Sequence, residues 1–319
     1  METRPLGRTG LDIAPVVLGC NVFGWTVDQP MAFRLLDRFV DAGLNAVDTA
    51  NSYSMWVPGN RGGESETMIG NWFAAKPGRR ERVVLITKVG APIAPDRKGL
   101  SSRNIVQAAE ESLRRLRTDR IDVYLSHYPD PSTPVEETLA AYDTLIRQGK
   151  VRAIGCSNYD AGELRAALTT AAAKGLPRYE VVQPEYNLYG RSSYEGPLRD
   201  LCIAEGLGVI VYYALASGFL TGKYRSTADL GKSPRGSAVS RYLDERGQRI
   251  LGALDKVAAA HDATPAEVAL AWLMAREGVT APIASATSVE QLESLIRATR
   301  LRLDPSEIEH LTRVSNPGE

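Results

Sequence analysis

Short apolar runs alternate with longer segments of mixed polarity along most of the chain. The run at 83–88 is apolar over its first four positions, and the segment after each run carries apolar residues at three- and four-residue spacing. Such runs are typical of strands buried on both faces, and the spacing of the longer segments is typical of helices. The pattern predicts eight strands, at residues 16–18, 46–48, 83–88, 121–127, 153–156, 181–183, 209–212 and 281–283.

Helices between successive strands enforce parallel pairing through right-handed crossovers. Eight repeats of strand and helix predict an α/β fold of the (β/α)₈ TIM barrel type. No interval has the composition of a linker, so residues 1–319 are expected to form a single barrel domain. Residues 4–13 lie outside the repeat and contain Arg8-Thr9-Gly10 between two short extended stretches. We expect an N-terminal β-hairpin there that plugs one end of the barrel.

Residues that suit helix ends support these boundaries. Asp28 can cap a helix that Gly43 ends, because a carboxylate accepts from free N–H groups and glycine adopts left-handed backbone. Pro134 and Pro265 are each expected in a first helical turn, where a missing N–H is tolerated. Thr264 then becomes an N-cap.

Two stretches interrupt the repeat, at 53–66 and at 213–247. Both are rich in glycine, serine or arginine and lack a strong period, and both follow predicted strands closely. In a barrel of this type, segments after the strands lie on the C-terminal rim, where ligands bind. We therefore expect two long loops at that rim.

The composition excludes several classes of partner. Apolar residues make up 44% of the chain, and 38 basic side chains balance 38 acidic ones, so neither nucleic acid nor a membrane surface is an expected partner. No signal-like apolar segment or long apolar run occurs, which predicts a cytoplasmic protein. The three cysteines lack C-x-x-C spacing and the three histidines are not paired, so no metal site is expected.

Four polar residues stand at or just after the ends of predicted strands: Asp48, Tyr53, Lys88 and His127. Strand ends of a barrel converge on one mouth, so these side chains are expected to meet. Each alone has an ordinary structural explanation, but their shared position at one end favours a joint role. Together they suit carbonyl reduction by hydride transfer, which needs a proton donor at the carbonyl oxygen. Lys88 is expected to lower the pKa of Tyr53, Asp48 to neutralise Lys88, and His127 to hydrogen-bond the substrate oxygen.

These residues carry a specific resemblance. The chain resembles the aldo-keto reductases over essentially its whole length, through D-T-A at 48–50 followed by Tyr53, T-K at 87–88 and L-S-H at 125–127. The resemblance implies an NAD(P)H-dependent oxidoreductase that reduces an aldehyde or ketone to the alcohol. It makes Tyr53 the general acid, Lys88 and Asp48 the residues that adjust the pKa of Tyr53, and His127 the residue that orients the carbonyl.

The resemblance also implies how a nicotinamide cofactor is held, since no strand-associated G-x-G-x-x-G is present. The carboxamide is expected at residues after strands five and six, the nicotinamide ring against an aromatic closing strand seven, and the pyrophosphate in the loop at 217–223. The cofactor-binding residues are then Gly19, Asn21, Asp48, Ser157, Asn158, Gln183, Tyr212, Leu215, Ser217, Gly218, Leu220, Lys223, Arg235, Thr287 and Gln291.

The adenosine end departs from the family pattern. Where the family often has a glutamate-asparagine pair, this chain has Ser294-Leu295, and no Lys or Arg occurs from Ser285 to Leu295. A 2′-phosphate favours an arginine or a lysine, and Arg235 could reach over to supply one. NADPH is therefore the expected cofactor, and NADH is not excluded.

Aromatic residues are expected to line the substrate pocket. Trp25, Trp56 and Tyr128, with Tyr53, favour an apolar or flat small-molecule carbonyl compound. Two other functions stay open: a non-catalytic nicotinamide-binding regulatory subunit of the same fold, as in channel-associated β subunits, and a lyase that forms a Schiff base on Lys88. The sequence favours no particular oligomeric state.

Overall fold

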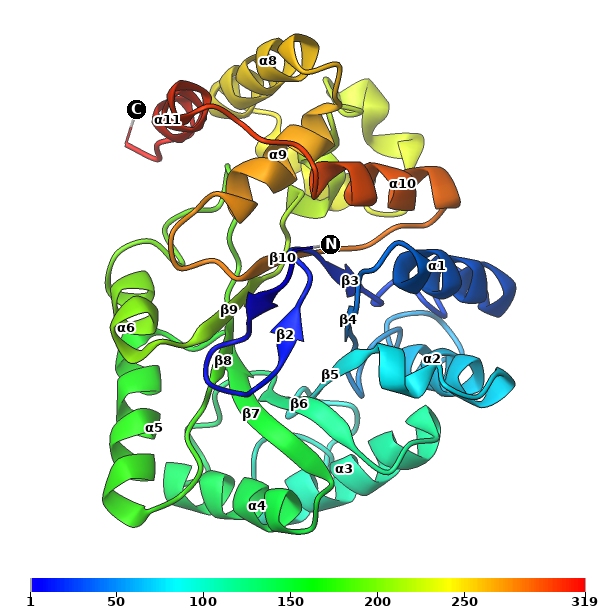
Figure 1. The fold of residues 1–319 in the computed structure, drawn as a ribbon, viewed down its shortest axis with the longest axis vertical. Helices are drawn as coiled ribbons and strands as arrows, with labels where there is room; N and C mark the ends of the chain where they lie inside the picture. Colours follow the sequence, from blue (N-terminus) through cyan, green and yellow to red (C-terminus); the bar gives the residue numbers. More distant parts are fainter. Residues whose placement is uncertain (1, 319) are drawn as a thin grey trace.

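Eight parallel strands surround the centre of the computed structural model, which describes residues 2–318 (Figure 1). They close into a barrel in the order β10-β3-β4-β5-β6-β7-β8-β9. All eight predicted strands are confirmed, with ends that differ by at most two residues. The strands are β3 (Val17–Gly19), β4 (Ala46–Asp48), β5 (Val84–Val89), β6 (Ile121–Ser126), β7 (Val151–Ser157), β8 (Val181–Gln183), β9 (Gly208–Val211) and β10 (Ala281–Ala284).

The N-terminal hairpin closes one end of the barrel, as the sequence predicts. Strands β1 (Arg4–Pro5) and β2 (Asp12–Ile13) pair antiparallel, and Figure 1 shows them across the centre of the ring of strands. Leu6 is fully buried in one apolar cluster with side chains from the barrel interior. Gly7 has a φ of 59°, and a Cβ there would lie 2.6 Å from the carbonyl oxygen of Glu180, just before β8. The interior is thus filled at its N-terminal end, which leaves the opposite end for a ligand.

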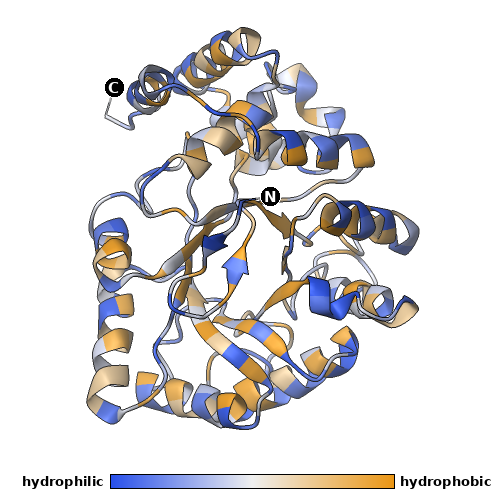
Figure 2. Ribbon diagram, viewed as in Figure 1, coloured by the Kyte–Doolittle hydropathy of each residue, from blue (hydrophilic) through white to orange (hydrophobic). Residues whose placement is uncertain are grey.

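Helices surround the strands. The ring consists of α1 (Gln29–Asp41), α2 (Glu64–Ala75), α3 (Ser102–Leu116), α4 (Val135–Arg147), α5 (Ala161–Lys174), α6 (Pro197–Glu205), α9 (Pro265–Met274) and α10 (Val289–Ala298). Of two further helices, α8 (Glu245–Ala260) packs against α9 and α11 (Pro305–Val314) packs against α8. The turn η1 (Arg80–Arg82) precedes β5. Figure 2 shows apolar residues along the strands and mixed polarity on the helices, as expected when each helix buries only one face.

Helix ends follow the predicted chemistry with one exception. The Asp28 carboxylate accepts from the N–H of Met31 at 2.9 Å and caps α1. Thr264 caps α9 in a capping box, with Pro265 in its first turn. Pro134 was expected in the first turn of α4 but is the N-cap itself, with an extended ψ of 134°. Its carbonyl oxygen accepts from the N–H of Thr138, which starts the helix without needing a proline N–H.

The two predicted loops lie on the C-terminal rim, after β4 and β9. The first consists of turns until α2 begins at Glu64. The second is less irregular than expected, because it contains η2 (Ala216–Thr221), η3 (Thr227–Lys232), α7 (Gly236–Val239) and η4 (Ser240–Tyr242). These helices are too short to produce a visible hydrophobic period. Within residues 2–318, no helix has the length and apolar character that crossing a bilayer requires.

Candidate active site

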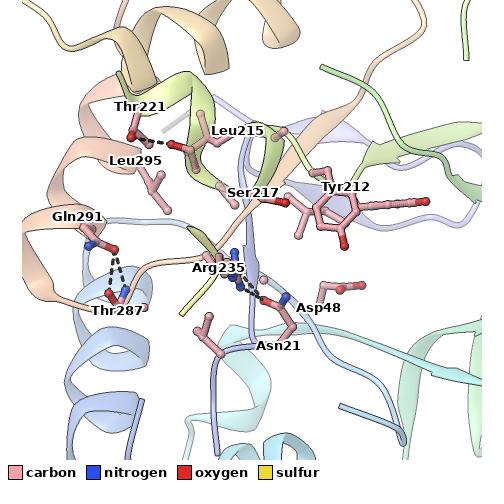
Figure 3. A pocket seen from close by; sticks show the side chains of 18 of the residues that line it. Asn21, Asp48, Tyr212, Leu215, Ser217, Thr221, Arg235, Thr287, Gln291 and Leu295 are labelled. Carbon is pink, nitrogen blue, oxygen red and sulfur yellow. Dashed lines mark hydrogen bonds between the residues drawn. The ribbon is translucent and has the colours of Figure 1, made fainter. Parts of the chain in front are cut away.

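A cavity of about 800 Å³ opens at the C-terminal ends of the strands. Figure 3 shows Tyr212 and Asp48 on one side, Thr287, Gln291 and Leu295 on the other, and Arg235 between them. Most of the residues that the sequence nominated come together here. Those that line the cavity are Gly19, Asn21, Asp48, Tyr53, His127, Tyr128, Ser157, Asn158, Gln183, Tyr212, Leu215, Ser217, Gly218, Lys223, Arg235, Thr287 and Gln291.

Three side chains form a hydrogen-bonded chain at one end of the cavity. The Lys88 ammonium donates to the Tyr53 hydroxyl and to the Asp48 carboxylate, both at 2.7 Å, and to the Thr49 carbonyl at 2.8 Å. Lys88 is fully buried, and these three acceptors engage all three of its N–H groups. The Tyr53 hydroxyl in turn donates to Asp48 at 3.3 Å. Strand pairing explains the convergence, because β4 and β5 lie side by side.

The surroundings of Tyr53 keep its phenol protonated. Burial raises the pKa of Tyr53 well above its ordinary value, and the Asp48 carboxylate raises it further. Burial and Asp48 therefore determine the net direction of the shift. That Lys88 by itself favours the phenolate stays a prediction. Burial also lowers the pKa of Lys88, and Asp48 counteracts that effect. The site thus presents a neutral phenol that still carries its proton.

His127 forms the next part of the wall. Its ring stands edge-on to Tyr53 with centroids 6.0 Å apart and stacks on Tyr128 at 4.8 Å. Burial, together with the Lys88 charge, lowers the pKa of His127 to about 3, so the imidazole is neutral near pH 7. Its Nδ1 is buried and has no hydrogen-bond partner among the described residues. Because His127 lines the cavity, its neutral ring can hydrogen-bond a ligand through the other nitrogen, Nε2.

Polar side chains after strands β7, β8 and β9 form a second network. Gln183 Nε2 donates to Asp48 at 2.8 Å, which leaves its Oε1 as an acceptor. Asn158 has a left-handed φ of 63° and donates through Nδ2 to the His127 carbonyl at 2.8 Å. The Tyr212 hydroxyl donates to Asn158 Oδ1 at 2.7 Å. Ser157 donates to the Gln183 carbonyl at 2.8 Å. The network links the residues nominated for a carboxamide to the Tyr53 end.

The loop after β9 has an unusual backbone. Tyr213, Ala216 and Ser217 adopt φ values of 52°, 47° and 58°, and Gly218 follows at 97°. Left-handed backbone is unfavourable for residues other than glycine and often occurs at ligand-binding sites. Leu220, which the sequence nominated for cofactor binding, belongs to this loop but is fully buried and does not line the cavity.

Two cations face the middle of the cavity. Arg235 hydrogen-bonds Asn21 Oδ1 at 3.3 Å and lies 5.3 Å above the ring of Trp25. Asn21 also accepts from Ser285 at 2.7 Å. Within residues 2–318, neither Arg235 nor Lys223 has a carboxylate partner. A largely buried guanidinium without a counterion favours an anionic ligand.

The far end of the cavity also contains residues that the sequence interpretation did not nominate, Arg297 among them. Thr287 donates from its N–H and hydroxyl to Gln291 Oε1, at 2.9 and 3.1 Å. Arg297, two positions past Leu295, also lines the cavity. Its spacing of three from Ser294 makes the two residues neighbours on the helix surface.

Exposed aromatic rings surround the mouth. Trp56, Tyr128 and Tyr213 are 48%, 46% and 44% exposed. Tyr213, which the sequence interpretation did not nominate, lines the cavity directly after β9. Trp56 does not line it but packs 6.2 Å from the Tyr53 ring and 5.8 Å from Trp25. Trp25 belongs to a neighbouring groove, so the two tryptophans support Tyr53 from the side.

No group of three or more histidine, cysteine, aspartate or glutamate side chains within residues 2–318 is arranged to hold a metal ion. The three cysteines are buried and unpaired. The polar groups that line the cavity are amides, hydroxyls, carboxylates, basic side chains, a phenol and an imidazole, which suit an organic ligand.

Comparisons with known proteins agree on one relationship. A model of the Aldo/keto reductase family matches residues 15–316. A Bacillus subtilis protein named "Uncharacterized oxidoreductase YrpG" is 38% identical over 315 residues, with 95% of this chain and 93% of that protein covered. "Protein tas" of Escherichia coli is 31% identical over 332 residues, with 95% and 94% covered. A "Probable voltage-gated potassium channel subunit beta" of Arabidopsis thaliana is 32% identical over 306 residues, with 93% and 91% covered.

Proposed function

This chain belongs to the aldo/keto reductase family of oxidoreductases, and we propose that it reduces an aldehyde or ketone to the alcohol with a nicotinamide dinucleotide as hydride donor. The observation that carries the proposal is the protonated Tyr53 phenol, 2.7 Å from the buried Lys88 ammonium, in the wall of the cavity. Proton transfer from a positioned side chain typically contributes about 10²–10⁴-fold to a rate.

Each residue at this end then has a defined task. Neutral His127 donates a hydrogen bond to the carbonyl oxygen and aligns it with the Tyr53 hydroxyl. Tyr53 passes its proton to that oxygen as negative charge develops there. Lys88 stabilises the phenolate that results, and Asp48 keeps the ammonium charged although it is buried. The reduced nicotinamide, when bound, supplies the hydride to the carbonyl carbon.

The middle of the cavity fits a dinucleotide. Lys223 and Arg235 supply two cations for a pyrophosphate, beside the left-handed backbone of Ser217 and Gly218. Gly19 lets Ser285 pack closely against β3 at the cavity wall, since a Cβ there would lie 2.9 Å from Ser285 Oγ. Ser157, Asn158 and Gln183 hold the carboxamide, and Tyr212 packs against the nicotinamide ring. We propose NADPH as the physiological cofactor, with NADH as the alternative.

A second candidate function comes from the relatives. Proteins named as potassium channel β subunits match 93% of this chain, so a nicotinamide-binding regulatory subunit is a specific alternative. The complete set of Asp48, Tyr53, Lys88 and His127 favours the enzyme. Carbonyl turnover distinguishes the enzyme from the regulatory subunit, because a purely regulatory subunit binds the cofactor but reduces no carbonyl compound.

The Schiff-base alternative fits the geometry poorly. Lys88 is fully buried, and its three N–H groups are engaged by Asp48, Thr49 and Tyr53. A nucleophilic amine needs a free lone pair and access to the substrate carbon. Borohydride with a carbonyl substrate should therefore trap no adduct on Lys88.

The proposal is tested by titration with NADPH and NADH, followed by a panel of aldehydes and ketones. Nicotinamide fluorescence reports binding, and loss of absorbance at the nicotinamide band reports reduction. We expect saturable binding of at least one dinucleotide and turnover with some members of the panel. A protein that binds neither dinucleotide would contradict the proposal.

A further inference from the structure

A second buried carboxylate lies behind the strand that carries Lys88. Glu66, in the first turn of α2, is fully buried and accepts from the Thr87 hydroxyl at 2.6 Å through Oε1. Its Oε2 accepts from Arg115 Nε, on α3, at 2.7 Å. Successive side chains of a strand point to opposite faces, so Thr87 reaches α2 while Lys88 reaches Tyr53. Glu66 and Lys88 therefore lie on the two faces of β5.

The start of α2 fixes the position of this carboxylate. Ser65 accepts from the Thr49 hydroxyl at 2.8 Å and donates to the Cys20 carbonyl at 2.8 Å. The first turn is thereby tied to the segments that follow β3 and β4. Gly70 lets α2 pack closely on α3, since a Cβ there would overlap the carbonyl oxygen of Arg115. Glu66 is thus held beside β5 by contacts with the barrel and with α3.

Several ionisable groups surround Lys88, and most of them are neutral near pH 7. Those that face it from the neighbouring elements are Asp48, Tyr53, Cys20 and His127 on the cavity side, and Glu66 and Tyr124, with Arg115 beyond them, on the helix side. Burial raises the pKa values of Tyr53, Cys20 and Tyr124, so these three keep their protons. His127, with its pKa lowered to about 3, is uncharged as well.

Two carboxylates therefore remain to balance the Lys88 ammonium. Burial lowers the pKa of Lys88, and both Asp48 and the more weakly acting Glu66 raise it. Arg115 neutralises Glu66 only in part from the viewpoint of β5, because its side chain is 25% exposed whereas that of Glu66 is fully buried. Water screens the exposed charge more than the buried one.

We propose that Glu66 is a positioning residue that acts through Lys88, as a second counterion on the opposite face of β5. Asp48 binds the ammonium directly, and Glu66 keeps the region behind the strand negative. Both carboxylates favour the charged form of Lys88. That form stabilises the Tyr53 phenolate during proton transfer, and only this last step rests on the proposed function.

The expected effect of Glu66→Gln is a lower pKa of Lys88. A unit charge roughly 10 Å away, at an effective dielectric constant of about 20, shifts a pKa by about one unit. Loss of a negative neighbour lets the ammonium release its proton at lower pH. Because turnover needs the ammonium, the loss of carbonyl turnover at alkaline pH should move to lower pH by about the same amount.

The test is an NMR titration of the full chain, isotope-labelled at lysine Cε, from neutral to alkaline pH, with Lys88→Met to assign the signal. We expect Glu66→Gln to lower the pKa of Lys88 by about one unit. Glu66→Asp should recover most of the shift, because it keeps the charge. Glu110→Gln, at a carboxylate that pairs with Lys150, is the matched control and should change nothing. Thermal melts verify that each variant is folded.

A purely structural role for Glu66 gives a different pattern. Glu66→Gln and Thr87→Val would then lower turnover at every pH without moving the pKa of Lys88, and that result would overturn the inference. An equal shift in Glu110→Gln, or no recovery in Glu66→Asp, would also overturn it.

A variant of opposite sign covers the case in which Glu66→Gln does not fold. Arg115→Gln removes the positive charge beside Glu66, so the pKa of Lys88 should rise, and a fall or no change would contradict the inference. The NMR titration needs no substrate. The expected shifts in a protein without carbonyl turnover would therefore contradict the proposed function and leave the pairing of Glu66 with Lys88 intact.

Discussion

The Lys88 ammonium lies 2.7 Å from the phenol oxygen of Tyr53, although 35 positions separate the two residues. Lys88 is the penultimate residue of β5, and Tyr53 follows the neighbouring strand, β4. Because the ammonium donates to this oxygen, the hydroxyl proton points away from it, toward Asp48 or a ligand. The contact therefore holds the phenol in the orientation that proton donation requires.

Replacing Lys88 with methionine should reduce carbonyl turnover almost as strongly as loss of the acid, by about 10²–10⁴-fold. An uncharged neighbour leaves the developing phenolate without stabilisation. Rates with saturating NADPH measure the effect, and Lys98→Met, in an exposed position, is the matched control. If Lys88→Met turned over the substrate at nearly the rate of the unmodified chain, the proposed role of Lys88 would be contradicted.

Asp48→Asn should destabilise the fold by about 3–5 kcal/mol, because it leaves the fully buried Lys88 ammonium without a counterion. Urea unfolding at pH 7 gives the change in free energy. In the exposed pair between Arg82 and Asp41, Asp41→Asn should change it by less than about 1 kcal/mol. Equal effects at the two positions would mean that the buried pair is unimportant.

The depressed pKa of His127 predicts a pH dependence of stability. In the unfolded chain a histidine binds a proton near pH ~6.5, whereas in the folded protein the pKa of His127 is about 3. The unfolded state therefore holds more protons between these values, and stability falls as the pH drops through this window, by at most about 1.4 kcal/mol per unit.

His127→Asn removes this contribution, so its free energy of unfolding should vary less between pH 6.5 and pH 4.5. The comparison is made by urea unfolding at both values for the two proteins. Parallel pH dependences would show that His127 is not held neutral by the fold.

Tyr213→Ala should weaken binding of large flat carbonyl compounds more than of small ones. The Tyr213 ring is 44% exposed at the mouth and lines the cavity. We expect the KM for an aromatic aldehyde to rise several-fold, because the loss of one aromatic contact costs roughly 1 kcal/mol. The KM for a short aliphatic aldehyde should change little. Ile203→Ala, at an exposed apolar residue on α6, is the control. A uniform change across substrates would show that Tyr213 does not select them.

The sequence alone predicted the barrel and most of the site, for a physical reason. Short strands buried on both faces stand out as apolar runs, and parallel strands place their C-terminal ends at one rim. The convergence of Asp48, Tyr53, Lys88 and His127 follows from that geometry.

Other features depend on packing that no local pattern reveals. The pKa of Tyr53 rises because of its burial, which one sequence cannot quantify. Leu220 was nominated from a motif but faces the core. The pairing of Arg297 with Glu267 joins two helices, so only the folded arrangement shows that Arg297 lines the cavity.

The central claim is that the Tyr53 hydroxyl delivers a proton to a carbonyl oxygen. The most direct test is Tyr53→Phe, with NADPH affinity and the single-turnover reduction rate measured on the same preparation. We predict a Kd for NADPH close to that of the unmodified chain and a reduction rate lower by about 10²–10⁴-fold. An unchanged rate at full occupancy would contradict the claim.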